Sequence, residues 1–136
     1  MDKKRAFLLN ETKIDSNEVF ILILGDQTPL LPGGLWTSYY GHLQEDHILC
    51  YKVKSTGLFK KTYSIEGTYK LWYKDMQTAE FGSGNGNLWL QMSFKQGPLV
   101  FTSGGDWTSP AAQVFVQKLS QLVSVIDLGL YTKKIK

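Results

Sequence analysis

The chain has 136 residues, of which 43% are hydrophobic, 13% aromatic and 20% charged, and its formal net charge is +3 at pH 7. This length predicts a single domain over residues 1–136, and the composition excludes a disordered or fibrous chain. The sequence has no apolar run near the ~20 residues needed to span a membrane, and the run after Arg5 is too short for a secretory signal. Cys50 is the only cysteine, which excludes an internal disulfide. We therefore expect a cytoplasmic protein.

The first part of the chain changes from polar to apolar near residue 19. Residues 1–18 are predicted to form a polar N-terminal extension, ahead of a β region over residues 19–108. The apolar run at 19–24 is typical of a buried strand, although a short helix fits the same run. Proline and glycine between residues 29 and 34 then predict an irregular connection.

The middle of the chain alternates between apolar and polar residues, as strands do. Alternation over residues 48–54, turn residues at 55–57 and alternation again over 58–65 predict an antiparallel hairpin. Glu66 and Gly67 are expected to end the second strand, and further strands are expected at 69–73 and 76–81.

The last part of the chain combines a hairpin with a helix. Leu88, Leu90, Met92 and Phe94 alternate with polar residues and Trp89, so one face of this strand is predicted to be buried, and a strand from residue 99 returns antiparallel to it. Ser109 followed by Pro110 is typical of a helix start, and apolar residues at three- and four-residue steps predict an amphipathic helix over 109–126. The basic tail 127–136 either adds an edge strand or frays.

The order of the predicted elements favours one fold class. Six to seven antiparallel strands followed by one helix argue against a parallel α/β fold. We expect a mainly β (α+β) domain, in which a bent antiparallel sheet or partly open barrel is capped by the C-terminal amphipathic helix.

This order resembles the pleckstrin-homology-like superfold, in particular its GRAM-like and short bacterial versions. The resemblance spans about residues 41–125 and rests on the segment 74–81, the strand 87–94, the turn at Gly97, the strand 99–101 and the helix 111–122. It implies that the helix caps one end of a bent barrel. It also implies binding of phosphoinositides, peptides or other proteins rather than catalysis.

Four lysines of the first hairpin are the main candidate site: Lys52, Lys54, Lys60 and Lys61. The first three can share the outward face, with the fourth near the turn, where exposed amides would add donors for a phosphate. Phosphoinositide-binding members of the resembled family carry basic residues on an early hairpin. The same pattern also fits a solvated hairpin whose lysines prevent pairing between sheet edges.

Other chemistry-bearing residues give weaker candidates. Trp72 and Trp89 are possible partner contacts because each lies opposite the apolar face of its own strand, although a sheet covered on both sides would bury them. His42, Glu45, Asp46 and His47 have metal-ligand chemistry, but so short a segment rarely converges its side chains on one ion. We find no nucleophile motif or phosphate-binding loop, and a single arginine argues against a nucleic-acid partner.

The sequence therefore predicts a non-enzymatic binding or adaptor module without metal or cofactor. Its lysine-rich hairpin would recognise an anionic ligand, such as a phospholipid head group, or an acidic protein partner. One alternative is a closed β-barrel of the calycin type with an internal site for a small hydrophobic ligand, suggested by the residues 34–36; another is a small inhibitor or immunity protein that acts by surface contact. An aromatic-lined cavity would favour the barrel, and a filled core with an exposed patch would favour the adaptor.

Overall fold

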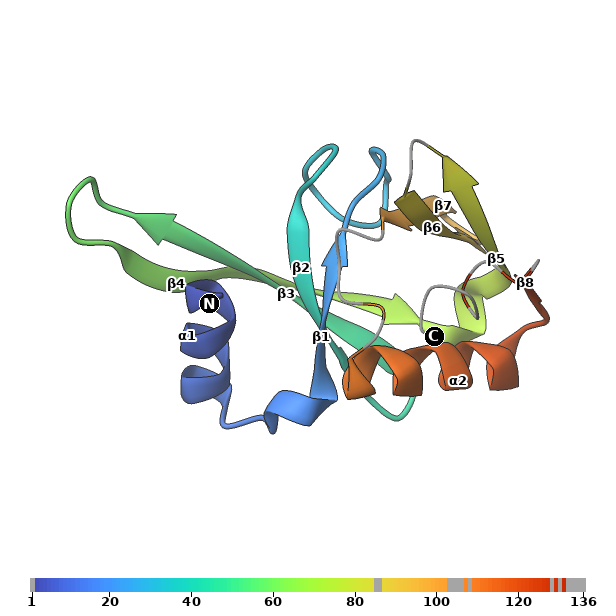
Figure 1. Ribbon diagram of the computed structural model, residues 1–136, viewed down its shortest axis with the longest axis horizontal. Helices are drawn as coiled ribbons and strands as arrows, with labels where there is room; N and C mark the ends of the chain where they lie inside the picture. The colour runs from blue at the N-terminus through green and yellow to red at the C-terminus, as the bar shows by residue number, and fades with distance from the viewer. Residues whose placement is uncertain are drawn as a thin grey trace.

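The computed structural model describes residues 2–84, 87–102, 107, 109–127, 129 and 131. Figure 1 shows two β-sheets, a long helix α2 along one side of them, and a hairpin that projects far from the body. Residues 85–86 of the glycine-rich turn, the break at 104–106, and Lys133, Lys134 and Lys136 of the tail lie outside the described residues. Within the described ranges, no helix combines the length and hydropathy required to cross a bilayer.

The first sheet is antiparallel, in the order β1-β2-β3-β4. Its strands are β1 (Val19–Ile23), β2 (Ser38–Leu43), β3 (His47–Thr56) and β4 (Thr62–Trp72). The apolar run at 19–24 thus forms a strand as expected. Glu66 and Gly67 do not end a strand: they lie inside β4, opposite a register shift between Lys52 and Val53. A β-bulge accommodates the extra residue, so one long strand replaces two shorter predicted ones.

The second sheet has the order β7-β6-β5-β8. Its strands are β5 (Met76–Gly84), β6 (Asn87–Phe94), β7 (Gly97–Thr102) and β8 (Val125–Asp127). The hairpin of β6 and β7 and the buried face of β6 are confirmed. Strand β8 contains Val125 and Ile126, which the sequence placed in the helix, and Asp127, the first residue of the predicted tail, and it pairs parallel to β5.

The two sheets meet along β1 and β7. Leu24 forms an isolated bridge with Phe101, and the Gly25 N–H donates to the Val100 carbonyl at 2.8 Å. The outer strands, β4 and β8, end the arrangement on either side. The prediction of a mainly β domain is confirmed, and the sheets are open, so the closed barrel of the calycin type does not form.

In the described part of the chain the fold is completed by two α-helices, α1 (Lys3–Thr12) and α2 (Pro110–Leu122). At the start of α2 the Ser109 hydroxyl accepts from the Ala112 N–H at 3.2 Å, the cap that its sequence predicts. This helix ends at Leu122 rather than at residue 126, because Val123 has extended backbone angles. The N-terminal segment predicted as a polar extension contains α1, whose first turn is capped by the Asp2 carboxylate.

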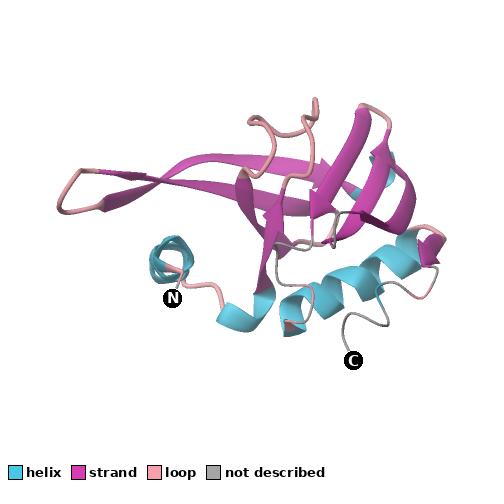
Figure 2. Ribbon diagram, turned by 45° about the horizontal axis from the view of Figure 1, so that its top comes forward, coloured by secondary structure: helices cyan, strands magenta, loops and turns pink. Residues whose placement is uncertain are grey.

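The buried side chains form two clusters on opposite faces of the first sheet. The larger cluster fills the space between both sheets and α2, where the rings of Phe20 and Phe115 stack with centroids 4.6 Å apart. Figure 2 shows α2 lying along the sheets, with α1 on its own beside the hairpin. The smaller cluster joins Leu8 of α1 to Val19, Tyr40 and Val53 of the first sheet. The larger cluster therefore holds α2 against the two sheets, and the smaller cluster holds α1 against the opposite face of the first sheet.

Candidate functional site

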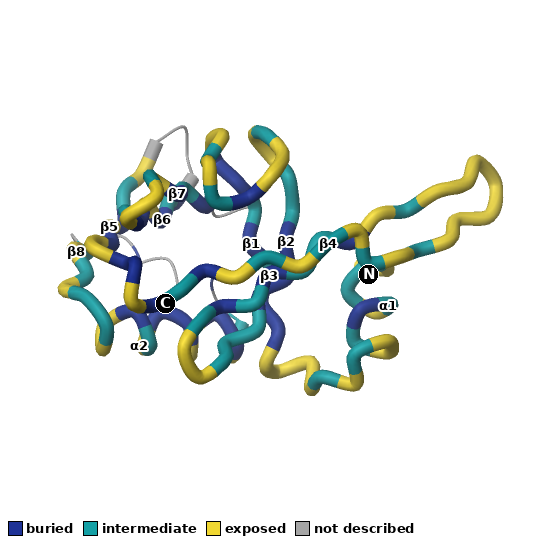
Figure 3. The backbone as a smooth tube through the Cα atoms, turned by 180° about the vertical axis from the view of Figure 1, so that it is seen from behind, coloured by how far each residue is buried: buried dark blue, intermediate teal, exposed yellow. Residues whose placement is uncertain are grey.

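The hairpin of β3 and β4 extends well beyond the rest of its sheet. Strand β2 pairs with β3 only as far as Tyr51, whereas β3 and β4 remain paired out to Thr56 and Thr62. The hydroxyls of these two threonines lie 2.8 Å apart and close the end of the ladder. Residues 57–61 form the tip, which Figures 1 and 3 show far from the core.

Helix α1 supports this hairpin from one side. Phe7 of α1 packs against Tyr63 of β4, with ring centroids 6.0 Å apart, and Ile65 joins the same cluster. The helix is itself anchored to the sheet: the Tyr40 hydroxyl donates to the Asp2 carboxylate at 2.9 Å, and the Arg5 guanidinium donates to the Val19 carbonyl at 2.7 Å. Burial and the adjacent carboxylate raise the pKa of Tyr40 well above its usual value, which keeps its hydroxyl a donor. Helix α1 therefore supports the projecting arm from its base out to Tyr63, close to the end of the paired strands.

The structure separates the four candidate lysines into two kinds. Lys52 is half-buried and forms an ion pair with Glu66, with 2.9 Å between Nζ and Oε2. Hydrogen bonding to Lys52 is the main cause that lowers the pKa of the Glu66 carboxyl, which favours its carboxylate form. Lys54, Lys60 and Lys61 are exposed and form no ion pair with the described residues. These three are the cations that the hairpin offers to a ligand.

The tip also carries two apolar side chains that the sequence interpretation placed in a strand. Leu58 is 87% exposed and Phe59 is 98% exposed. The predicted turn at 55–57 is displaced: β3 continues to Thr56, and the chain turns over residues 57–61. In the sequence, Leu58 and Phe59 stand directly between Gly57 and the two lysines Lys60 and Lys61, which is compatible with an exposed turn. The same residues also fit the alternation of a strand, which is how the sequence was interpreted.

The two predicted partner-contact tryptophans are both half-buried. The Trp72 ring lies against His47 and has the ammonium groups of Lys70 and Lys74 5.3 and 5.7 Å from its centroid. Trp89 packs over Gly25, where even a methyl group would collide with its ring. Neither forms part of the hairpin tip. Trp36, in the connection between β1 and β2, is more exposed, at 56%.

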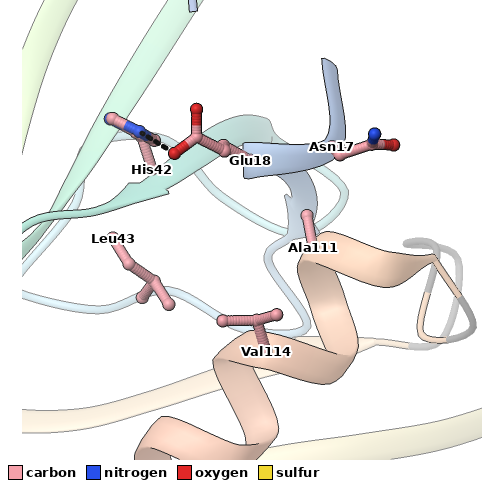
Figure 4. Close-up of a pocket in the computed structure, with 6 residues that line it drawn as sticks. All are labelled: Asn17, Glu18, His42, Leu43, Ala111 and Val114. Atoms are coloured by element: carbon pink, nitrogen blue, oxygen red, sulfur yellow. Dashed lines mark ion pairs between the residues drawn. The ribbon is translucent and has the colours of Figure 1, made fainter. Parts of the chain in front are cut away.

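A surface pocket of about 260 Å³ lies between β2 and the start of α2. Figure 4 shows its lining: Asn17, Glu18, His42, Leu43, Ala111 and Val114. The His42 imidazole has Nε2 4.0 Å from Glu18 and Nδ1 2.6 Å from the Gln44 amide. The ionisable side chains among these lining residues are Glu18 and His42, which face each other across the pocket wall.

The histidines and acids that have metal-ligand chemistry do not converge. His47 bonds to Asp46 at 2.7 Å, which lowers the pKa of that carboxyl, whereas His42 faces Glu18 and Gln44. Within the described part of the chain, no group of three or more histidine, cysteine, aspartate or glutamate side chains is placed to hold a metal ion. Cys50 is fully buried in the larger cluster.

No family model, no curated protein and no solved structure matches this chain.

Proposed function

We propose that this protein is a non-enzymatic binding module that recognises an anionic ligand of the phospholipid head-group class. The observation that carries the proposal is the projecting hairpin, on which Lys54 of β3 and Lys60 and Lys61 of the tip are all exposed. Ammonium groups on such a tip attract phosphate oxygens, and the loop 57–61 leaves them open to approach.

The order of elements supports the same proposal. Four antiparallel strands, then three more, then one helix that packs its Phe115 on β1 follow the order of the pleckstrin-homology-like superfold. We propose membership of that superfold as the structural setting, with α2 as the capping helix. Its binding members recognise lipids or proteins without catalysing a reaction. Open sheets whose facing side chains form one buried hydrophobic cluster also fit a surface binder better than a carrier of an enclosed ligand.

The test is co-sedimentation with vesicles of neutral lipid alone and of neutral lipid mixed with anionic lipid, at low and high salt. Wild type is compared with Lys54→Ala/Lys60→Ala/Lys61→Ala. A matched control removes three other exposed lysines, Lys70, Lys74 and Lys95, and therefore the same total charge.

We expect wild type to bind the anionic vesicles, to bind less at high salt, and to lose binding in the hairpin variant far more than in the control. Equal losses in the two variants would mean that net charge and not the hairpin is recognised. No binding by folded wild type would refute the proposal.

A further inference from the structure

The most exposed large apolar side chains among the described residues are adjacent and lie at the hairpin tip. Phe59 is 98% exposed and Leu58 87%, more than Leu35, Trp36, Val114 or Ile126. Neither belongs to a buried cluster. Leaving two such side chains in water is unfavourable, and a fully exposed apolar feature is typical of a contact site.

The tip holds these side chains in a defined position. Gly57 has a φ of +108°, and a Cβ there would lie 2.1 Å from the Lys60 carbonyl oxygen, so the loop turns sharply at a residue that only glycine suits. Below it, Thr56 and Thr62 close the ladder, and α1 braces the arm through Phe7 and Tyr63. The apolar pair is therefore presented at the end of a supported arm.

Three exposed lysines adjoin the apolar pair. Lys60 shares the tip with it, Lys61 is the tip residue next to β4, and Lys54 lies farther back along β3, opposite Ser64. Lysine has a long apolar stem and a cationic end, so it can reach phosphates while its stem lies beside acyl chains. Apolar residues at the extremity with cations behind them match the order of layers in an anionic bilayer, where phosphates lie above the hydrocarbon.

The small size of the tip favours a bilayer over a protein as its binding partner. A stable protein interface buries about 800 Å² on each partner, far more than a five-residue loop offers. A bilayer is a continuous phase, into which even one or two apolar side chains can partition.

We infer that Leu58 and Phe59 insert into the interfacial layer of an anionic membrane while Lys54, Lys60 and Lys61 contact its head groups. This inference rests on the proposed function and specifies the ligand as an intact bilayer surface rather than a free head group or an acidic protein.

The first test compares Leu58→Ser/Phe59→Ser with wild type on the same anionic vesicles. The matched control is Val114→Ser/Ile126→Ser, which changes two exposed apolar side chains elsewhere. We expect the tip variant to lose at least about tenfold in vesicle affinity while keeping its salt dependence, and the control to change by less than about twofold. Thermal unfolding of each variant shows that it is folded.

A second test measures directly whether the tip enters the membrane. In a Cys50→Ala background, a polarity-sensitive fluorophore is attached at Phe59→Cys or, as a control, at Gln77→Cys on the exposed face of β5. We expect anionic vesicles to shift the emission of the tip label to shorter wavelength and to leave the control label unchanged.

The outcomes separate the inference from the function on which it rests. Binding that requires the three lysines but not Leu58 or Phe59, with no shift of the tip label, would overturn insertion and leave head-group recognition standing. Failure of wild type to bind any anionic vesicle would overturn both, and would direct the search to an acidic protein partner.

Discussion

Lys52 of β3 and Glu66 of β4 form an ion pair at the β-bulge, with 2.9 Å between Nζ and Oε2. The bulge lies next to Tyr51, the last β3 residue that pairs with β2, so the ion pair is at the base of the projecting arm. It links β3 and β4 at the point where β2 stops pairing with β3. It also compensates the charge of one of the four lysines that the sequence presents as equivalent.

Replacing Glu66 by glutamine should strengthen binding to anionic vesicles. The change leaves Lys52 without its carboxylate partner and adds one positive charge to the hairpin. Since a lysine near an anionic surface contributes about 1 kcal/mol, we expect affinity to rise about fivefold at low salt. Glu80→Gln on the exposed face of β5 makes the same charge change away from the hairpin. An equal gain in both variants would contradict a specific role for Lys52.

The same ion pair should make stability depend on pH. Lys52 lowers the pKa of Glu66 below its ordinary value of 4.5, so the carboxyl binds a proton less readily in the folded than in the unfolded chain. The pair therefore stabilises the fold above that value, and its contribution disappears as pH falls through the lowered pKa. We expect the melting temperatures of wild type and Glu66→Gln to differ at neutral pH and to converge as the pH falls through the lowered pKa of Glu66. A constant difference across this range would contradict the assignment.

The thiol of Cys50 should be inert in the native protein. It is fully buried, and burial raises its pKa to about 12, so thiolate is scarce and reagents have no access. We expect maleimide to label unfolded protein rapidly and native protein only as it opens. The Phe59→Cys variant serves as control, because its new thiol at the tip should react at once. Fast labelling of native wild type would show that Cys50 is accessible.

Phe115 should be the residue of α2 on which stability depends most clearly. Its ring is fully buried and stacks on Phe20 of β1, so Phe115→Ala leaves a cavity and should cost about 3–5 kcal/mol in the free energy of unfolding. Its neighbour Val114 is 52% exposed, and Val114→Ala should stay within about 0.5 kcal/mol. Urea unfolding measures both. Similar losses would mean that α2 packs through a different face.

Gly57→Ala should disturb the tip. A methyl group there would lie 2.1 Å from the Lys60 carbonyl oxygen, at a φ of +108° that other residues rarely adopt, so the loop must rearrange at a cost of about 1–3 kcal/mol. We expect weaker vesicle binding with an unchanged core. Gly82→Ala meets no atom within 4 Å and should be tolerated. Unchanged binding by Gly57→Ala would show that the tip conformation does not matter.

Much of the fold follows from local patterns. The alternation from Leu88 to Phe94 predicts the buried face of β6, and Ser109 with Pro110 predicts the start of α2. These predictions succeed because period and capping depend on neighbours within a few residues. Helix α1 was missed because its segment is mainly polar. The other buried members of its Leu8 cluster are Val19, Tyr40 and Val53, which belong to strands of the first sheet.

For the candidate site too, one part could be predicted from the sequence and another part depended on the tertiary structure. Sequence alone located the cationic hairpin, since Lys52, Lys54, Lys60 and Lys61 occur within ten positions of one another. Only the tertiary structure decided which of them are free to meet a ligand, because the pairing of Lys52 with Glu66 depends on a register shift between strands. It also placed Leu58 and Phe59 in water rather than in a sheet, since the register of Thr56 with Thr62 decides where the chain turns. Alternation indicates that a strand exists, but cross-strand register, a property of two segments together, determines what its end exposes.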